Sequence, residues 1–189
     1  MARRTLLKAQ DRQELFDIPA DEDSLIRHYS LSPADRLEIE LRRRKHNQLG
    51  FAVQLCLMRY PGRALLPNEI PPSAMLNYVA EQIDADPRLF AFYARREETR
   101  RDHIAHLLRY LEIRSPTGMD RRAALRAAID TASTTDQGAV IAKAIIATYR
   151  ERRALLPVAT MIERMGLAAR AIARRRAEAA LISELAPEK

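Results

Sequence analysis

The stretch that decides the fold reads Asn47-Gln-Leu-Gly-Phe-Ala-Val-Gln-Leu-Cys-Leu-Met-Arg-Tyr60. Wound as an α-helix, it carries apolar side chains on two different faces. One face holds Leu49, Ala52, Val53, Cys56 and Leu57, and the other holds Phe51, Leu55 and Met58. A helix that is apolar on both faces is buried on both sides, and the Pro61-Gly62 pair that follows ends it. We therefore expect a core helix against which the neighbouring helices pack.

Helix signals continue on both sides of this stretch. Upstream, Ser32-Pro33-Ala34-Asp35 supplies a hydroxyl N-cap, a proline at the first helical position and a carboxylate at the third, which predicts a helix start. We expect this helix to carry the basic run Arg42-Arg43-Arg44-Lys45 into the central helix, with a break between Asn47 and Gly50. Downstream, apolar residues recur at spacings of three and four. The pattern predicts an all-α protein.

The segment Ser115-Pro116-Thr117-Gly118 interrupts the helical pattern and is the best linker in the sequence. A chain of 189 residues allows one large or two small domains, and can bury roughly 70% of its unfolded surface without disulfides or metals. We therefore expect two helical subdomains, Met1 to Ser115 and Pro116 to Lys189, the first organised by the central helix.

The cysteine count and the hydropathy bear on the compartment. The single Cys56 falls inside the predicted core helix, where it acts as a small apolar residue, and one cysteine cannot form an internal disulfide. No segment reaches the roughly 18 apolar residues that a membrane span needs. We expect a soluble cytosolic protein with no membrane partner.

The charge balance points toward phosphate groups. The chain has 32 basic residues against 25 acidic ones, for a net charge of +7, and most of the basic residues are arginine. The guanidinium group pairs with two oxygens at once, which suits phosphate contacts. A solvated surface rich in helix-forming charged residues gives the same composition, so charge alone leaves both interpretations open.

Two basic clusters are predicted to contact a DNA backbone. Arg42, Arg43, Arg44 and Lys45 repel one another when packed together, so they are expected outside the core. Arg100 and Arg101 are expected on the exposed first turn of a later helix, together with His103. The alternative for the first cluster is a solvated helix end whose cations favour the negative end of the helix dipole.

Catalytic and metal chemistry find little support. His103 and His106 have no carboxylate or cysteine beside both at ligand spacing, so we expect no metal. The five glycines form no phosphate-binding loop, and the acidic residues lie mostly at helix starts or beside arginines. We expect no cofactor and no catalytic residues in this chain.

Residues 158–185 contain a possible helix-turn-helix. Gly166 is expected to form the tight turn and Ile172 to pin the second helix, which leaves Arg170 and Arg174 on the outer face, where arginine can read guanine. The pattern departs from the motif at Ile162, where a small residue is usual, and at Arg175, where an apolar one is expected. The alternative is a helical hairpin with a solvated arginine face.

Four segments in order carry a family resemblance. They are Leu49-Gly-Phe-Ala-Val-Gln-Leu-Cys56, Arg59-Tyr-Pro-Gly-Arg63, Glu69-Ile-Pro-Pro72 and Tyr93-Ala-Arg-Arg-Glu-Glu-Thr-Arg-Arg-Asp-His103. Together they resemble the N-terminal region of replicative transposases of the Tn-three family, over most of Met1 to Leu111 and more loosely to the end. The resemblance implies a bacterial, nucleoid-associated fragment that binds the terminal inverted repeats of its element as double-stranded DNA. It also implies that the C-terminal acidic metal-binding site for strand cutting and joining is absent here.

Two functions follow as hypotheses. In the first, the chain recognises transposon-end DNA: the last helix reads bases through Arg170 and Arg174, and the two basic clusters neutralise the backbone. In the second, it is a helical dimerisation or docking scaffold, whose arginines meet acidic protein surfaces and which self-associates within the longer transposase.

Overall fold

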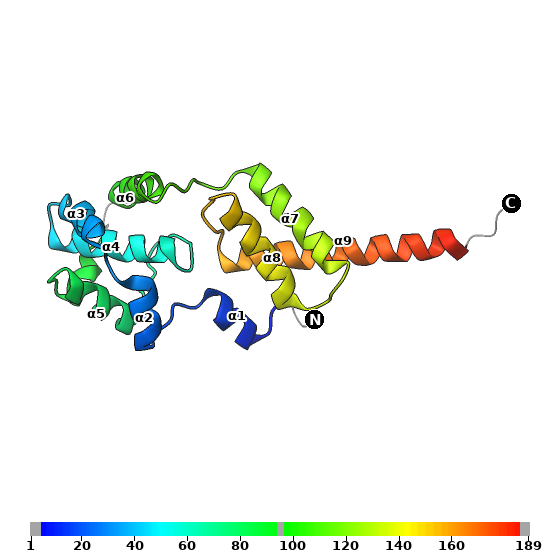
Figure 1. Ribbon diagram of the computed structural model, residues 1–189, viewed down its shortest axis with the longest axis horizontal. Helices are drawn as coiled ribbons and strands as arrows, with labels where there is room; N and C mark the ends of the chain where they lie inside the picture. The colour runs from blue at the N-terminus through cyan, green and yellow to red at the C-terminus, as the bar shows by residue number, and fades with distance from the viewer. Residues whose placement is uncertain (1–4, 94–96, 186–189) are drawn as a thin grey trace. The chain divides into compact units, whose positions relative to one another are not determined.

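The computed structural model describes residues 5–93 and 97–185 (Figure 1). Every regular element within these ranges is a helix, which confirms the all-α prediction. The elements are α1 (Ala9–Phe16), α2 (Glu22–Tyr29), α3 (Pro33–Glu40), α4 (Lys45–Arg59), α5 (Ser73–Gln82), the short 3-10 helix η1 (Pro87–Phe92), α6 (Glu97–Tyr110), α7 (Gly118–Ala132), α8 (Gly138–Glu151) and α9 (Ala159–Leu185).

The chain divides into two compact units. Residues 17–114 form one, here called the α4 unit; the segment up to Phe16 joins the chain from Ser115 onward in the other, here called the α9 unit. From the sequence, the N-terminal segment is expected in the first subdomain, whereas Leu6 and Leu7 are buried in the core of the α9 unit. No local pattern marks this pairing, because it joins residues that are far apart in the sequence.

Helix α4 is the centre of its unit, as predicted. All ten residues from Leu49 to Met58 are buried, and α4 contacts α2, α3, α5, α6 and η1. Its one buried polar side chain within that stretch, Gln54, accepts a hydrogen bond from the backbone N–H of Leu65 at 2.9 Å. The amide therefore holds the loop after α4 against the helix. Burial also raises the pKa of the Cys56 thiol to about 12, consistent with its role as a small apolar residue.

The expected break between Asn47 and Gly50 is wrong. Helix α3 ends at Glu40, residues 41–44 form a turn, and α4 begins at Lys45. Arg44 adopts an extended conformation as the N-cap of α4, and the side-chain amide of Gln48 donates to the carbonyl of Arg42 at 2.8 Å. This hydrogen bond holds the turn ahead of the apolar stretch, and the stretch itself stays helical.

Asp35 ties three helices together. It closes the predicted capping box with Ser32 at the start of α3, and its carboxylate is fully buried. Arg59 at the end of α4 pairs with both carboxylate oxygens, and the Tyr110 hydroxyl donates to one of them at 2.7 Å. Burial raises the pKa of Asp35, but hydrogen bonds from Arg59, Tyr110 and Ser32 lower it by more, to about 2. Asp35 is therefore a structural carboxylate.

The α9 unit also contains a buried capping carboxylate that is bound by an arginine. Thr117 and Asp120 form a capping box at the start of α7, Asp120 is fully buried, and the Nε of Arg152, just after α8, donates to it at 2.7 Å. Beneath this contact, α7, α8 and α9 enclose an apolar core that includes Ala124, Ala128, Ile141, Ile145, Ile162 and Ala169. Each unit thus pins a capping carboxylate with an arginine from the end of a later helix.

The predicted turn at Gly166 is wrong, and with it the helix-turn-helix at residues 158–185. Helix α9 runs without interruption from Ala159 to Leu185 (Figure 1). Gly166 lies inside α9, and Leu6 packs directly against it. A Cβ at position 166 would lie 2.2 Å from Leu6 Cδ2, so only glycine fits there without a shift. The glycine makes room for a neighbouring side chain and leaves the backbone helical.

Candidate nucleic-acid interface

Arg42 faces inward. Its guanidinium carbon lies 4.6 Å from the centre of the Phe51 ring, and its Nε is buried. This cation–π contact anchors the 41–44 turn on α4. The arrangement favours a structural role for Arg42.

Arg43 and Arg44 are exposed at the tip of the same turn. In the part of the chain that the structure describes, neither side chain has an acidic partner. Lys45 is also exposed, and its Nζ donates to the carbonyl of Ile83 at 3.0 Å. Three adjacent cations, two of them unpaired, can meet an incoming phosphate without breaking an ion pair.

Arg100 and Arg101 differ sharply. The side chain of Arg100 is only 17% exposed; it pairs with Glu97 at 2.6 Å and donates to the carbonyl of Leu65 at 3.2 Å. Arg101 is 75% exposed, and its Nε lies 3.8 Å from the same Glu97. Arg100 therefore holds the loop at Leu65 against α6, whereas Arg101 is accessible.

His103 is buried, contrary to the expectation that it is exposed. Its ring stacks beside Tyr93 and meets the Phe51 ring edge-on, and Tyr93 Oη lies 3.2 Å from His103 Nδ1. Burial, followed by the charge of Arg42, lowers the pKa of His103 to about 4. The apolar stripe of α6 gives no sign of this contact, because the facing rings come from α4 and from Tyr93, just after η1.

His106 lies one turn further along α6 and faces α3. Its Nε2 is 2.6 Å from Glu38 Oε2, and its ring meets the Phe51 ring edge-on. Among the residues that the structure describes, no three His, Cys, Asp or Glu side chains are grouped so as to hold a metal ion.

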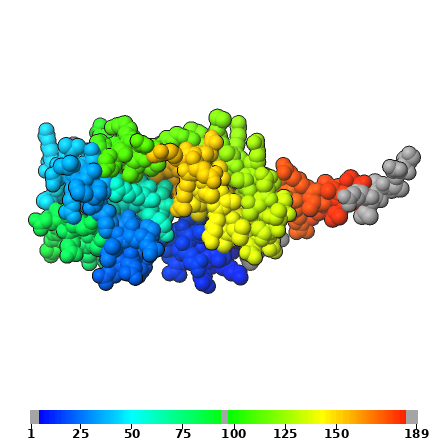
Figure 2. Space-filling view, viewed as in Figure 1, coloured from blue at the N-terminus to red at the C-terminus, as the bar shows by residue number. Residues whose placement is uncertain are grey.

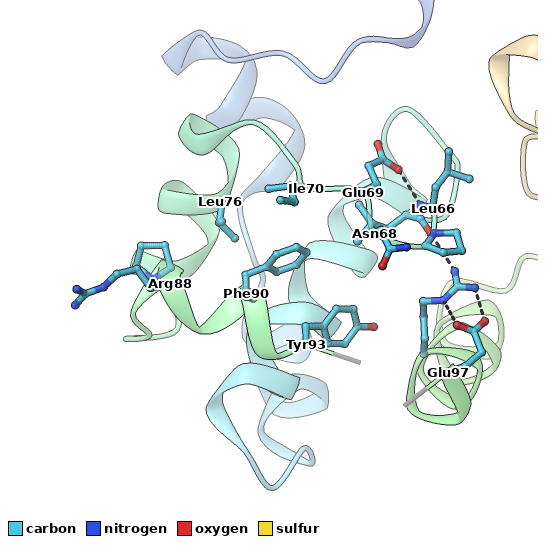
Figure 3. A pocket seen from close by; sticks show the side chains of 14 residues that line it. Leu66, Asn68, Glu69, Ile70, Leu76, Arg88, Phe90, Tyr93 and Glu97 are labelled. Carbon is cyan, nitrogen blue, oxygen red and sulfur yellow. Dashed lines mark hydrogen bonds and ion pairs between the residues drawn. The ribbon is translucent and has the colours of Figure 1, made fainter. Parts of the chain in front are cut away.

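A cavity of about 500 Å³ opens beside Tyr93, the residue whose ring stacks on His103 (Figure 3). Apolar side chains of the 65–70 loop, α5 and η1 form its walls, among them Leu66, Ile70, Leu76 and Phe90. Glu69 and Glu97 also line it, and both are paired with arginine, Arg63 and Arg100 respectively. The two arginines that line the cavity, Arg88 and Arg100, are paired with Asp86 and Glu97. The cavity therefore has apolar walls and no free cation, which does not suit a phosphate group.

Helix α9 presents the other predicted arginines. Arg170 is half-buried and donates to the carbonyl of Asp136, so it holds the α7–α8 loop. Arg174 is 76% exposed and pairs with Glu178 at 2.7 Å. Arg176 is not among the predicted interface residues. It is exposed and lines a cavity of about 520 Å³ with Arg170 and Arg174.

Beyond Ala173, α9 leaves the core of its unit. Residues 174–183 are all exposed, and this part of the helix projects past α7 and α8 (Figures 1 and 2). Leu181 and Ile182 are among the exposed side chains. Arg174 and Arg176 therefore stand at the base of a projecting helix.

The fold and these surfaces define a class: a basic all-α protein with accessible arginines that include those at the 41–44 turn, on α6 and along the projecting part of α9. Residues 6–169 match a family described as "Domain of unknown function (DUF4158)", and the chain belongs to that family. In the part of the chain that the structure describes, no helix has the length and apolar character that crossing a membrane requires.

Curated relatives are transposases. The chain is 39% identical over 98% of its length to the transposase for transposon Tn501 of Pseudomonas aeruginosa, and 38% identical over 98% to that for Tn21 of Escherichia coli. It is 31% identical over 92% to the transposase for Tn1546 of Enterococcus faecium. These matches confirm the resemblance to Tn-three transposases. The chain spans about a fifth of their length, 19% of the first two and 18% of the third.

Proposed function

We propose that this chain binds double-stranded DNA and recognises the terminal inverted repeats of a transposon. The observation that carries the proposal is the pair of exposed, unpaired arginines at the 41–44 turn, Arg43 and Arg44, in a chain similar to transposases. Guanidinium groups without an acidic partner form charge-assisted bonds to phosphate oxygens at low cost.

The geometry sorts the predicted interface residues into two groups. Arg43, Arg44, Lys45 and Arg101 of the α4 unit, with Arg174 and the added Arg176 of the α9 unit, are accessible and are proposed to contact DNA. Arg42, Arg100 and Arg170 bind within the protein and are proposed to hold the turn, loop and helix that present the others. Strand cutting and joining is proposed to belong to parts of the transposase outside the segment that this chain matches.

The test measures, by fluorescence anisotropy across a salt series, how tightly the protein binds an inverted-repeat duplex and a scrambled duplex. Specific sites are typically bound about 10³-fold or more tighter than non-specific ones, and each neutralised phosphate adds roughly 0.9 to the log–log salt slope. Equal affinity for both duplexes would overturn repeat recognition, and no binding to either would overturn DNA binding.

A matched pair of variants isolates the turn. Arg43→Gln should weaken binding to both duplexes and lower the salt slope by about 0.9, the value for one phosphate contact. Arg88→Gln is the control: it removes the same charge from the same unit, but Arg88 is already paired with Asp86 at 2.7 Å. Equal losses for the two variants would mean that net charge, rather than the turn, determines binding.

A second candidate function is a docking scaffold. Leu37 and Leu41 are 66% and 65% exposed, one turn apart at α3 and its C-cap. Exposed leucines at this spacing are typical of a surface that another helix covers. Sedimentation of the protein without DNA tests it: self-association that rises with concentration and is abolished by Leu37→Ser with Leu41→Ser would favour the scaffold, and a monomer at all concentrations would exclude self-association through α3.

A further inference from the structure

A second basic site lies in the α9 unit, and none of its three arginines is among the predicted DNA contacts. Between α7 and α9 there is an open cavity of about 310 Å³, lined by Arg121, Arg122, Leu125, Arg164, Met165 and Ala168. Three of these six residues are arginines and none is acidic. All three arginines are exposed.

The packing of the two helices brings the arginines together. Arg121 and Arg122 lie near the start of α7, and Arg164 lies in the second turn of α9. The two helices contact each other and bury small or flexible residues in one core, Ala124 and Ala128 on α7 and Met165 and Ala169 on α9. Since these helices approach closely, the arginines at their edges face a common space.

The acidic residues next to these arginines in the sequence are engaged elsewhere. Asp120, next to Arg121, is fully buried and bound by Thr117 and Arg152. Glu163, next to Arg164, pairs with Arg12 of the N-terminal segment. Within residues 5–93 and 97–185, none of Arg121, Arg122 and Arg164 forms an ion pair.

Three like charges around one space repel one another, and an anion bound between them offsets the repulsion. Two features match a unit of DNA backbone. The guanidinium groups can bridge phosphate oxygens from opposite sides, and the floor of Leu125, Met165 and Ala168 offers an apolar surface to the adjoining deoxyribose.

We propose that Arg121, Arg122 and Arg164 form a clamp for one backbone phosphate of duplex DNA. This inference rests on the proposed DNA binding, and it adds a contact site in the α9 unit. The clamp grips the backbone without reading bases, so it acts equally on the inverted repeat and on other sequences.

The test compares Arg122→Gln and Arg164→Gln with Arg126→Gln. Arg126 is an exposed arginine on α7 outside the cavity, so its variant carries the same change in charge on the same helix. The clamp variants should each lower the salt slope by about 0.9 on both duplexes, and Arg126→Gln should leave it unchanged. The double variant should again lose about 0.9 rather than twice that, because both side chains hold one phosphate.

The outcomes separate the two proposals. If the unmodified protein binds no duplex, the proposed function and the clamp both fail. If it binds DNA and the clamp variants behave like Arg126→Gln, the clamp alone fails. Thermal unfolding of each variant serves as a check, since a change at an exposed arginine should leave the unfolding temperature unchanged.

A further arm separates DNA from free phosphate. Inorganic phosphate is added at an ionic strength matched with chloride, and its binding is followed by the protection of the arginines from phenylglyoxal. Protection of Arg122 and Arg164 by duplex supports the clamp. Protection by inorganic phosphate with none by duplex would overturn it as a DNA contact.

Discussion

At the scale of single residues, His103 couples the stability of the α4 unit to pH. Its folded pKa of about 4 lies below the unfolded value of about 6.5, so the unfolded state binds more protons between these values. The contribution of His103 to the free energy of unfolding should therefore be greatest above pH 6.5, and the free energy of unfolding should fall by about 3 kcal/mol as the pH drops to 4. Urea unfolding at several pH values measures this loss.

The control for this prediction is His103→Gln, which removes the titrating ring. The residues that face the ring are Phe51 and Tyr93, while Arg42, Asp102 and His106 act through their charges. The variant should start less stable, because it loses the ring contacts, and should lack the extra loss between pH 6.5 and 4. Parallel curves for the variant and the unmodified protein would assign the pH dependence to other groups.

Asp35 affects the stability of the protein in a separate range of pH. Its pKa is depressed to about 2, so the stability that its bonds provide is present above pH 4 and is lost as the pH falls toward 2. The two windows do not overlap, because one belongs to a buried neutral base and the other to a buried charged acid. The same Asp35 that marks a helix start in the sequence thus also bonds Arg59 and Tyr110 from two other helices.

At the scale of elements, the continuity of α9 can be tested with proline. Ala168 is exposed in mid-helix, two residues beyond Gly166. Ala168→Pro should cost about 3 kcal/mol or more, because proline removes a backbone hydrogen bond and clashes with the preceding turn. Ala168→Gly is the matched control, at about 1 kcal/mol. If chemical unfolding shows that the proline variant is as stable as the glycine variant, a helix must begin near residue 167.

The projecting part of α9 carries a second prediction at this scale. Arg174 is exposed on a helix that stands clear of its unit and is able to enter a groove. If it reads a base, Arg174→Ala should cost about 1 to 3 kcal/mol on the inverted repeat and much less on a scrambled duplex. Anisotropy titrations on the two duplexes measure the difference, and equal losses would make Arg174 a phosphate contact.

At the scale of the whole molecule, the two units have separate cores. In the α4 unit, a Cβ on Gly50 would lie 1.9 Å from the Tyr93 ring, so Gly50→Ala should destabilise that unit even though alanine favours helices by about 1 kcal/mol. Hydrogen exchange should then quicken at the α4 amides and stay unchanged in α7 and α8. Gly138→Ala, which would meet the backbone carbonyl of Leu6, should do the reverse.

This pair of variants also tests the division of the chain. Faster exchange throughout both units after either substitution would mean that they unfold as one. The variants are matched in chemistry, since each adds one methyl group to a helical glycine. They differ in the neighbour that resists it, a ring in one unit and a backbone carbonyl in the other.

Sequence patterns within a few neighbouring residues were enough to predict the fold class, the core helix and the basic character of the surface. The two-faced apolar stretch from Leu49 to Met58 identified the core helix, the Ser32 to Asp35 segment identified a helix start, and the arginine excess identified a basic surface. These features were readable because helix periodicity and capping depend on residues within a few positions of one another. Four motifs in order were enough to indicate the transposase family.

Only the tertiary structure decided which polar side chains remain free. Arg42 and Arg43 are neighbours in the sequence, yet one lies over Phe51 and the other is exposed. Gly166 is typical of a turn by sequence, but Leu6, 160 positions away, makes it a contact point within a straight helix. Whether a charge is paired or a glycine is packed depends on what distant segments bring to it, and no local pattern in the chain encodes that neighbour.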